Sequence, residues 1–381
     1  MGQPQTFWRR AVEKDIKFFV GLDVHKDSIS ISVCEPGREV SQFRGTIRHD
    51  VPALLKVLRK LGMPAAQLVA YEAGPTGYGL HRRLVQEGYG CQVVAPSLIP
   101  RRTGDRIKTD RRDSARLAEL LRAGELKPIW VPDLEHEALR NLWRAREDAM
   151  QMRLKARQHL KAFLLRQGRI YVGKTSWNKT HARWLADQAF EHAADQLAFT
   201  EYVLASQGAD ERLARLDQAL VQITRAWRFE PVVSALRTLR GIDTVSAIGL
   251  VAEIGDIQRF AHPRHLMSYL GLVPSEQSSG NSVHRGAITK TGNSHARRLL
   301  TEASWHYRYP ARLSNALKSR QDGQPEAICK HAWKAQVRLC GRFAHLQRRG
   351  VHVNKVCIAT ARELTGFIWA IARQAGIASG A

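Results

Sequence analysis

With 381 residues, the chain is too long for one ordinary hydrophobic core and predicts two or three domains. Its 59 lysines and arginines outnumber 35 aspartates and glutamates, which gives a formal net charge of +24. This excess predicts a polyanionic partner, most commonly a phosphate backbone, because each neutralised phosphate releases counterions. A hydrophobic share of 44% argues against wholesale disorder. No window of the sequence approaches the ~20 apolar residues that a membrane span needs. The excess of positive charge disfavours an ordinary metabolic enzyme.

Cysteine usage predicts a reducing, cytoplasmic compartment. The five cysteines are odd in number, scattered and never spaced as C-x-x-C. This pattern is typical of free thiols rather than of a disulfide framework or a zinc site. The first residues also lack the apolar run of a signal peptide. We therefore expect a cytoplasmic protein that has no membrane partner.

Residues 16–128 predict an α/β domain built around a mixed sheet. Strand signals come first as a meander and then alternate with amphipathic helices, an order that favours a helix-covered sheet. The predicted strands cover residues 16–23, 28–35, 41–47, 68–72 and 91–95. The predicted helices cover residues 51–61, a segment that ends at 87, and a segment from Asp110 to a stop at Gly124.

Residues 129–230 predict a basic helical connector. The segment PIWVP at 128–132 indicates a stiff, extended linker, and two long helices follow, of which the first covers Leu134–Gln167 and the second ends near Phe229. Two interpretations stay open: a coiled-coil hairpin that joins two subunits and, slightly favoured, an arm along nucleic acid. The second is favoured because few acids offset the basic residues of the first helix, which are Arg140, Arg144, Arg146, Arg153, Lys155, Arg157, Lys161 and Arg166.

Residues 231–310 predict a small separate module, and residues 311–381 predict a helical tail in which nothing specifies chemistry. Within the module, LRTLRGIDTVSA at 236–247 fits a helix-hairpin-helix that turns at Gly241. In such an element, backbone amides at a helix amino terminus hold a DNA phosphate without reading sequence. The segment G-I-D-T replaces the more usual G-x-G, so an ordinary glycine-linked helix pair is the alternative.

Four acids of the first domain form a set that we call the acid tetrad: Asp23, Glu72, Asp110 and Asp113. The first two end predicted strands, and the last two are three residues apart on one face of a predicted helix. Ligands bind at strand ends of open sheets, and carboxylates gathered there repel one another unless a divalent cation neutralises them. Their oxygens suit Mg²⁺ or Mn²⁺, which support phosphoryl transfer. Each acid alone is more often a turn former or a cap.

Basic residues lie beside these acids. Lys108, Arg111 and Arg112 flank the start of the predicted helix, where their charges would meet phosphates. His25 and Lys26 follow Asp23 directly. Two interpretations of these two residues are equally good. They could orient a ligand or a phosphate, or they could simply lie in a solvated hairpin turn.

A Gly/Ser/Thr-rich stretch at 271–293 predicts a loop between helices and carries Arg285 and Lys290. A serine next to a glycine in a mobile basic loop fits a nucleophile toward phosphate. Ser-Gly pairs are also ordinary loop material, and the residues alone favour that interpretation.

Several of these motifs resemble a known family. GLDVHKDSISISV, YEAGPTGYGL and KTDRRDSARLAELLRAGEL resemble the amino-terminal domain of DEDD-type bacterial transposases of the insertion-sequence one-ten family. The run from LRTLRGIDTVSA to SHARRLLTEASW resembles that family's carboxy-terminal transposase domain. The two matches cover roughly residues 17–170 and 232–310, in the family's order and with a helical connector between them. Together they are highly specific.

The resemblance implies a RuvC-like (RNase H-type) first domain, a coiled-coil connector and a mainly α-helical transposase domain. It implies that the acid tetrad binds Mg²⁺ or Mn²⁺. It also implies a nucleophilic serine that precedes a glycine, which selects Ser279 and leaves the adjacent Ser278 as the alternative. This serine would attack a DNA phosphodiester and form a phosphoserine link while a 3′ hydroxyl departs.

Partners follow from the same resemblance. Members of the family act on DNA. They are thought to be guided by a structured non-coding bridge RNA that comes from the element. They are also thought to work as dimers or tetramers in which the metal site and the serine come from different subunits. The resemblance therefore implies that the protein is located in the bacterial cytoplasm, at the nucleoid.

Three other functions agree with parts of the sequence. A RuvC-like Holliday-junction resolvase or nuclease that uses water explains the tetrad and the charge but leaves the second module without a role. A sugar-kinase or actin-like ATPase matches the first hairpin but predicts an adenosine-binding Gly-Gly segment and a second D-x-G-x-T, which are absent. A non-catalytic nucleic-acid scaffold is the third.

Overall fold

The computed structural model describes residues 16–100, 109–279 and 282–378, which form parts of two compact units. The first unit is residues 1–132 and the second is residues 133–381. Lys108, one of the predicted phosphate-binding residues, lies outside the described residues. None of the helices in these described ranges is long and apolar enough to cross a membrane.

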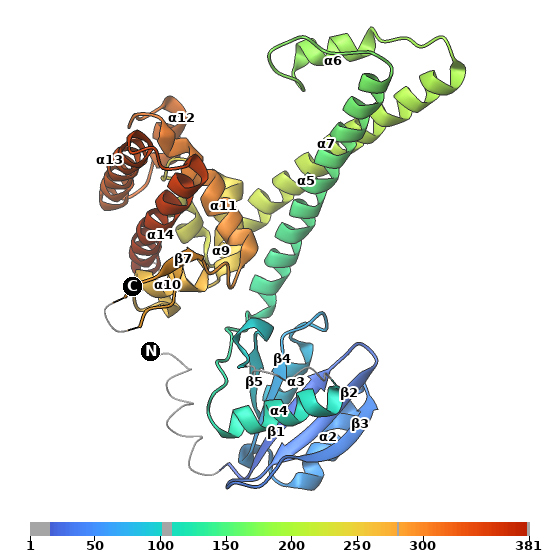
Figure 1. Cartoon of the computed structure of the whole chain (residues 1–381), viewed down its shortest axis with the longest axis vertical. Coiled ribbons are helices and arrows are strands. Elements are labelled where there is room, and N and C mark those ends of the chain that lie inside the picture. The colour runs from blue at the N-terminus through green and yellow to red at the C-terminus, as the bar shows by residue number, and fades with distance from the viewer. Residues whose placement is uncertain (1–15, 101–108, 280–281, 379–381) are drawn as a thin grey trace. The chain divides into compact units, whose positions relative to one another are not determined.

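A mixed five-stranded sheet forms the centre of the first unit, as the strand and helix order predicts (Figure 1). The strand order is β3-β2-β1-β4-β5, with antiparallel pairing of β1 to β2 and of β2 to β3, and parallel pairing of β1 to β4 and of β4 to β5. The strands are Phe18–Val24 (β1), Ser28–Cys34 (β2), Gln42–Arg48 (β3), Gln67–Glu72 (β4) and Gly90–Val94 (β5).

Helices cover both faces of this sheet. Helices α2 (Val51–Leu61) and α3 (Gly79–Gln86) pack their leucines on one face, against alternate apolar residues of the strands. Helix α4 (Asp110–Arg122) packs on the other face, where Leu117 and Leu121 share a cluster with Ala70 and Val94. Strand residues alternate between faces, so this three-layer arrangement explains why β1, β4 and β5 are nearly continuously apolar.

Helix α4 approaches β1 closely because Gly21 has no side chain. A Cβ atom at Gly21 would fall on backbone atoms of Ser114 and Ala118 of the helix. The hydroxyl groups of Ser32 and Ser114 share a hydrogen bond of 2.8 Å in the same buried layer. These contacts place the amino-terminal turn of α4 over the end of β1.

The segment expected to be a plain linker packs on the sheet instead. Pro128 forms an isolated bridge with Val94, and the amide of Ile129 donates to the carbonyl of Val93 at 2.8 Å. Ile129 and Val131 contact the core beneath α2 and α3. The segment is extended, as its prolines predict, but it belongs to the edge of the first unit up to Pro132.

Two long helices, α5 (Leu134–Arg166) and α7 (Ala193–Thr224), pack together in the second unit as a helical hairpin (Figure 1). Both long helices are therefore present as the sequence predicts. The short helix α6 (Lys179–Ala186) lies in the connection between them. Near this connection, Phe163 of α5 packs with Phe199 of α7 and with Phe190.

The rest of the second unit is mainly helical and has one hydrophobic core. This core extends from Leu139 and Trp143 of α5 to the last helix, so the predicted connector, module and tail share it. The helices are α8 (Glu230–Leu236), α9 (Thr244–Ile254), α10 (Pro263–Tyr269), α11 (Ser294–Ser304), α12 (Asn315–Gln321), α13 (Glu326–Arg348) and α14 (Val353–Ala378). Short 3-10 turns cover Pro64–Ala66, Pro96–Leu98, Ile257–Arg259 and Trp305–Arg308.

A two-stranded antiparallel hairpin stands where the sequence predicts only a loop. Its strands are Pro274–Glu276 (β6) and Arg285–Ile288 (β7). Strands this short, with exposed side chains, carry little periodic signal. The hairpin holds the Gly/Ser-rich stretch between α10 and α11.

Candidate functional site

The carboxyl ends of two parallel strands bring two of the predicted acids to one sheet edge. Gly21 of β1 pairs with Ala70 of β4, and the register continues to Leu22 and Tyr71. Asp23 and Glu72 are the next residues on each strand, on the same face as Gly21. This is the face that α4 covers, so the amino terminus of α4 lies near the same edge.

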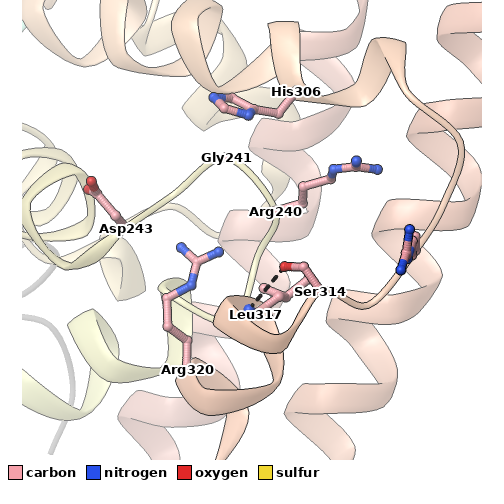
Figure 2. A pocket seen from close by; sticks show the side chains of 8 residues that line it. Arg240, Gly241, Asp243, His306, Ser314, Leu317 and Arg320 are labelled. Carbon is pink, nitrogen blue, oxygen red and sulfur yellow. Dashed lines mark hydrogen bonds between the residues drawn. The ribbon is translucent and has the colours of Figure 1, made fainter. Parts of the chain in front are cut away.

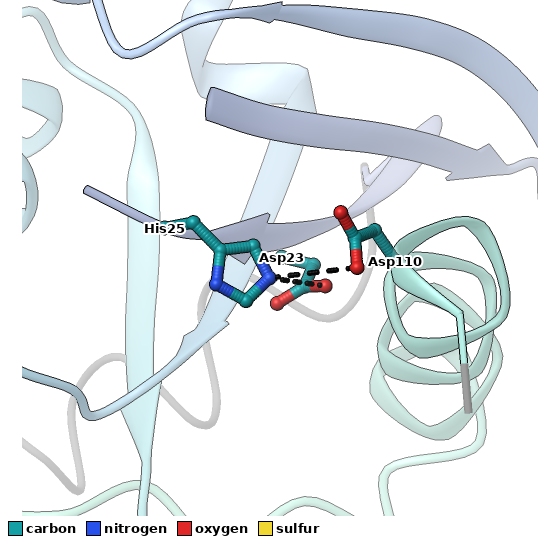
Figure 3. Close-up of side chains that lie close together, drawn as sticks. All are labelled: Asp23, His25 and Asp110. Atoms are coloured by element: carbon teal, nitrogen blue, oxygen red, sulfur yellow. Dashed lines mark hydrogen bonds and ion pairs between the residues drawn. The ribbon is translucent and has the colours of Figure 1, made fainter. Parts of the chain in front are cut away.

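Asp23, His25 and Asp110 come together at this edge (Figure 3). Nε2 of His25 donates to Oδ2 of Asp23 at 3.2 Å and lies 3.6 Å from Oδ1 of Asp110. One ligand atom from each of the three residues lies within 4.8 Å of the others. The side chain of Asp23 is 15% exposed, whereas those of His25 and Asp110 are about half exposed. The cluster is therefore open to solvent on one side.

The surroundings of Asp23 raise the pKa of its carboxyl group. Partial burial raises this pKa above its ordinary value, and the nearby carboxylates of Asp110 and Asp113 raise it further. The charge of His25 and its hydrogen bond act in the opposite direction. A group whose charged form is disfavoured by burial and like charges is the kind that a bound cation stabilises.

The donor set fits a divalent cation. Carboxylate oxygens are the preferred ligands of Mg²⁺ and also bind Mn²⁺, whereas an imidazole nitrogen suits Mn²⁺ better than Mg²⁺. Asp113 lies one helical turn from Asp110 and acts on the charge of Asp23, but it does not belong to the group of mutually close ligand atoms. Glu72 stands at the end of β4 and is also outside that group among the described residues.

His25 joins the cluster although the sequence left its role open. It follows β1 in the turn to β2, and a turn side chain can point to either face of a sheet. The amide of His25 donates to the carbonyl of Ser28 at 2.9 Å, which tightens the turn. The imidazole of His25 contacts both aspartates. In the sequence, the feature that could have indicated this role is the position of His25, two residues after an acid at the end of a strand.

The predicted basic residues Arg111 and Arg112 stand at the start of α4 and have different surroundings. The guanidinium of Arg111 lies 5.4 Å from the ring centroid of Phe43, in cation–π geometry. Arg112 is exposed, and its backbone amide is capped by the Thr109 hydroxyl at 3.3 Å. Both residues belong to the first turn of α4, beside Asp110.

Ser278 and Ser279 differ in their surroundings, although both are exposed. The backbone of Ser279 exchanges two hydrogen bonds of 3.1 Å with Ser282, which closes the end of the β6–β7 hairpin. The hydroxyl of Ser278 donates to Oε1 of Glu276 at 2.9 Å. Arg285 donates to the other oxygen of Glu276 at 3.3 Å. These hydrogen bonds, from Ser278 first and Arg285 second, lower the pKa of Glu276.

A buried acid anchors the far end of this loop. Glu253 of α9, which is 2% exposed, accepts two hydrogen bonds from Arg144 of α5 at 2.9 and 3.1 Å. It also accepts one from the side-chain amide of Asn293 at 2.6 Å, and Asn293 caps α11 by accepting from Ala296. Neither Glu253 nor Asn293 is among the functional residues that the sequence predicts. The available signal was a single acid within the apolar run AIGLVAEIG.

Replacing Glu253 by Gln should lower the stability of the second unit at neutral pH by about 1–3 kcal/mol, since charge-assisted hydrogen bonds are lost. Burial raises the pKa of Glu253, but Arg144 and Asn293 outweigh it and lower the pKa below its ordinary value of 4.5. The contribution is therefore complete above about pH 4.5 and is lost as pH falls through the lowered pKa. Urea unfolding of both proteins from pH 7 to pH 3 tests this. A difference in stability that is unchanged by pH would contradict it.

Two of the predicted nucleic-acid-binding residues on α5 are engaged within the hairpin. Arg157 donates to both carboxylate oxygens of Asp210 at 2.7 and 2.9 Å and stacks 4.5 Å from the ring centroid of Trp177. Arg153 lies 3.7 Å from the same carboxylate. Lys155 is exposed. Of these three residues, Lys155 therefore presents its charge to solvent most fully.

Replacing Lys155 by Ala should flatten the salt dependence of nucleic-acid binding by about one unit of log–log slope per lost phosphate contact, with an unchanged unfolding temperature. The triple replacement of Arg153, Lys155 and Arg157 should weaken binding further and also lower stability, because it breaks the pairs with Asp210. Fluorescence anisotropy over a salt series measures the slope. An unchanged slope in both variants would favour a connector that only joins subunits.

The remaining predicted residues lie in the helical part of the second unit. Gly241 is in the turn between α8 and α9 with φ of 82°, and a Cβ atom there would meet the carbonyl oxygen of Ala303 at 2.5 Å. The turn therefore needs glycine both for its backbone conformation and for its close packing. Lys290 has φ of 55° and lines a cavity of about 420 Å³ together with Arg297 and Trp305.

Comparisons with known proteins fit both units. A family model described as "Transposase", for the DEDD transposases of the IS110 type, matches residues 20–167. A second model, described as "Transposase IS116/IS110/IS902 family", matches residues 233–316. The first match includes the acid tetrad, and the second includes the β6–β7 hairpin and Gly241.

Similar proteins match along nearly the whole chain. A transposase predicted in Sinorhizobium fredii (y4qE) is 45% identical over 368 residues, which cover 96% of this chain and 91% of the relative. The transposase for insertion sequence element IS1533 of Leptospira borgpetersenii is 32% identical and covers 87% of this chain and 97% of its own length. The transposase for IS1111A of Coxiella burnetii is 24% identical, over 95% of this chain and 91% of the relative.

Proposed function

Because the chain belongs to the IS116/IS110/IS902 family of transposases, a family of enzymes that recombine DNA, we propose that it cuts and rejoins DNA through the acid tetrad and a serine nucleophile. The observation that carries the proposal is the convergence of Asp23, His25 and Asp110 where parallel strands end. Ligand sites in sheets of this kind form at that edge. A bacterial insertion sequence is the DNA on which such an enzyme acts.

The first unit has a RuvC-like fold in this proposal. Its sheet has an antiparallel meander of three strands followed by two parallel strands, in the order β3-β2-β1-β4-β5. The central strand β1 carries the first acid, the neighbouring β4 carries the second, and the helix after β5 carries the last two. The sheet and α4 thus bring together acids that are 87 residues apart in sequence, from Asp23 to Asp110.

Asp23 and Asp110, with Glu72 and Asp113 beside them, are the residues that would hold Mg²⁺ or Mn²⁺. When bound, the ion polarises the phosphodiester and stabilises the charge of the departing oxygen. His25 holds the two aspartates in place through its contacts at 3.2 and 3.6 Å. Arg111 and Arg112 lie on the same helix turn as Asp110 and would contact the phosphates of the strand.

Ser279 is the nucleophile in this proposal. Its oxygen attacks phosphorus and forms the phosphoserine bond while the bond from phosphorus to the 3′ oxygen breaks. The serine loses its proton and the departing 3′ oxygen gains one to become a hydroxyl, so the number of protons is unchanged. Arg285 and Lys290 stabilise charge on the phosphoryl oxygens. The support is positional: Ser279 precedes a glycine, is exposed, and closes the hairpin, whereas the hydroxyl of Ser278 is held by Glu276. The covalent phosphoserine conserves the bond energy for rejoining.

Guide RNA and oligomerisation complete the proposal. A net charge of +24 suits polyanionic partners, which in this proposal are DNA and a structured bridge RNA. The α5–α7 hairpin exposes apolar side chains, including Leu154, Leu197 and Leu204, which suit contacts with a second subunit in a dimer or tetramer. The protein then acts in the bacterial cytoplasm at the nucleoid.

Formation of a covalent protein–DNA adduct tests this function. The wild-type protein is incubated with its bridge RNA, Mg²⁺ and end-labelled DNA of the element's junction, and the products are separated under denaturing conditions. We expect a labelled adduct that a protease removes and EDTA prevents. Cleaved strands with no adduct at any time would instead show a nuclease that uses water.

A further inference from the structure

A basic cavity of about 340 Å³ lies between the turn that joins α8 to α9 and the segment that leads into α12 (Figure 2). Its volume is in the range of pockets that bind small ligands. The wall combines Arg240, His306, Arg312 and Arg320 with one acid, Asp243. The predicted hairpin turn and the predicted tail, which the sequence treats as unrelated, thus share one cavity.

Two guanidinium groups are fixed by backbone carbonyls on opposite sides of the cavity. Nη1 of Arg240, in the turn, donates to Pro310 at 2.8 Å and more weakly to Tyr309. Nη1 of Arg320, in α12, donates to the carbonyl of Ile242 in the turn. Each arginine therefore reaches across to the other wall. Both carry further N–H donors on a rigid, planar fork, which suits an oxyanion.

The charges of this cavity favour an anion. Three arginines face one carboxylate, and that carboxylate already accepts from the amide of Ser246 at 2.8 Å as the cap of α9. Burial and the surrounding arginines Arg308, Arg240 and Arg320 lower the pKa of His306. Burial also lowers the pKa of Arg320. Crowded positive charge of this kind is relieved when a negative group binds.

We propose that this cavity holds one phosphate of the DNA backbone, with Arg240, Arg312 and Arg320 as its ligands. The proposal rests on the transposase function, since DNA is the polyanion on which that function acts. The site anchors a strand without reading its sequence, because contacts to phosphate oxygens carry no sequence information. Gly241 packs on the carbonyl of Ala303, so the turn that carries Arg240 sits firmly against α11.

Arg312 offers the cleanest test, because its side chain is exposed and lines the cavity. The matched control is Lys318 of α12, which is exposed and does not line the cavity. Binding of full-length R312Q and K318Q to duplex DNA is measured by anisotropy over a salt series without Mg²⁺. We expect R312Q to weaken binding about 3- to 10-fold at low salt and to lower the log–log slope by about one, with K318Q within about twofold of wild type.

A second measurement locates the phosphate. Duplexes that each carry one neutral methylphosphonate linkage are compared with unmodified DNA. At one position the neutral linkage should weaken binding of the wild type but not of R312Q, because the lost contact is the same. Equal weakening by R312Q and K318Q, no such position, or an effect of R312Q on RNA alone would each overturn the proposal. The assay reads no strand cleavage, so its failure leaves the transposase function standing, and a missing covalent adduct leaves the cavity result unchanged.

Discussion

Replacing Asp23 by Asn is expected to lower the rate of Mg²⁺-dependent strand cleavage by about 1,000-fold or more. A bound divalent ion supplies several kcal/mol of transition-state stabilisation, and each 1.36 kcal/mol is tenfold in rate. Asp23 is the most buried acid of the cluster and contacts His25 directly, so its loss removes the central ligand. Single-turnover cleavage of labelled DNA with saturating protein and Mg²⁺ measures the rate.

The control for this prediction is Asp27→Asn. Asp27 is an exposed acid in the same turn between β1 and β2, and it lies outside the group of close ligand atoms. We expect its cleavage rate to stay within about twofold of wild type. Because burial and, to a smaller extent, the nearby carboxylates raise the pKa of Asp23, its charge costs stability at neutral pH. We therefore expect D23N to unfold at no lower temperature than wild type. Equal cleavage by D23N and wild type would contradict the metal site.

Replacing Ser279 by Ala is expected to abolish the covalent adduct and all strand exchange, because no hydroxyl remains to attack the phosphodiester. Replacing Ser278 by Ala should leave the adduct in place, since the hydroxyl of Ser278 is held by Glu276. Both serines are exposed, so neither change should alter stability by more than about 0.5 kcal/mol. Denaturing gels and peptide mass spectrometry detect the adduct and its position.

The paired serine variants separate three outcomes. An adduct in S278A but not in S279A supports Ser279 as the nucleophile. The reverse pattern would show that Ser278 is the nucleophile. In that case Glu276, whose Oε1 lies 2.9 Å from the hydroxyl oxygen of Ser278, would accept the proton. Undiminished strand cleavage by both variants, with no adduct in either variant or in the wild type, would show that water is the nucleophile.

Much of the first unit could be predicted because its local patterns are strong. Alternation with period two marks β2, and apolar spacing marks α2, whose predicted bounds at residues 51 and 61 match the structure. The position of Asp23 at the end of a buried strand also follows from the pattern, since parallel strands end at one edge. These signals are local, so one sequence suffices to find them.

Other parts of the site depend on partners far apart in sequence. Glu253 is buried because Arg144, 109 residues away, supplies its counter-charge, and no periodicity announces such a pair. The sequence alone predicts that the connector arginines form a free basic face. In the structure, however, Arg157 of α5 donates to Asp210 of α7 across the hairpin. His25 joins two aspartates only because a turn directs its ring toward α4.

The most direct test of the central claim is the position of a metal ion in a crystal of the protein with Mn²⁺ and DNA, read from anomalous scattering. We expect an anomalous peak coordinated by Asp23 and Asp110, with a phosphate of the DNA beside it. A peak held by other residues, or a cleavable strand bound where these two carboxylates contact no ion, would show that the metal site is not at Asp23 and Asp110.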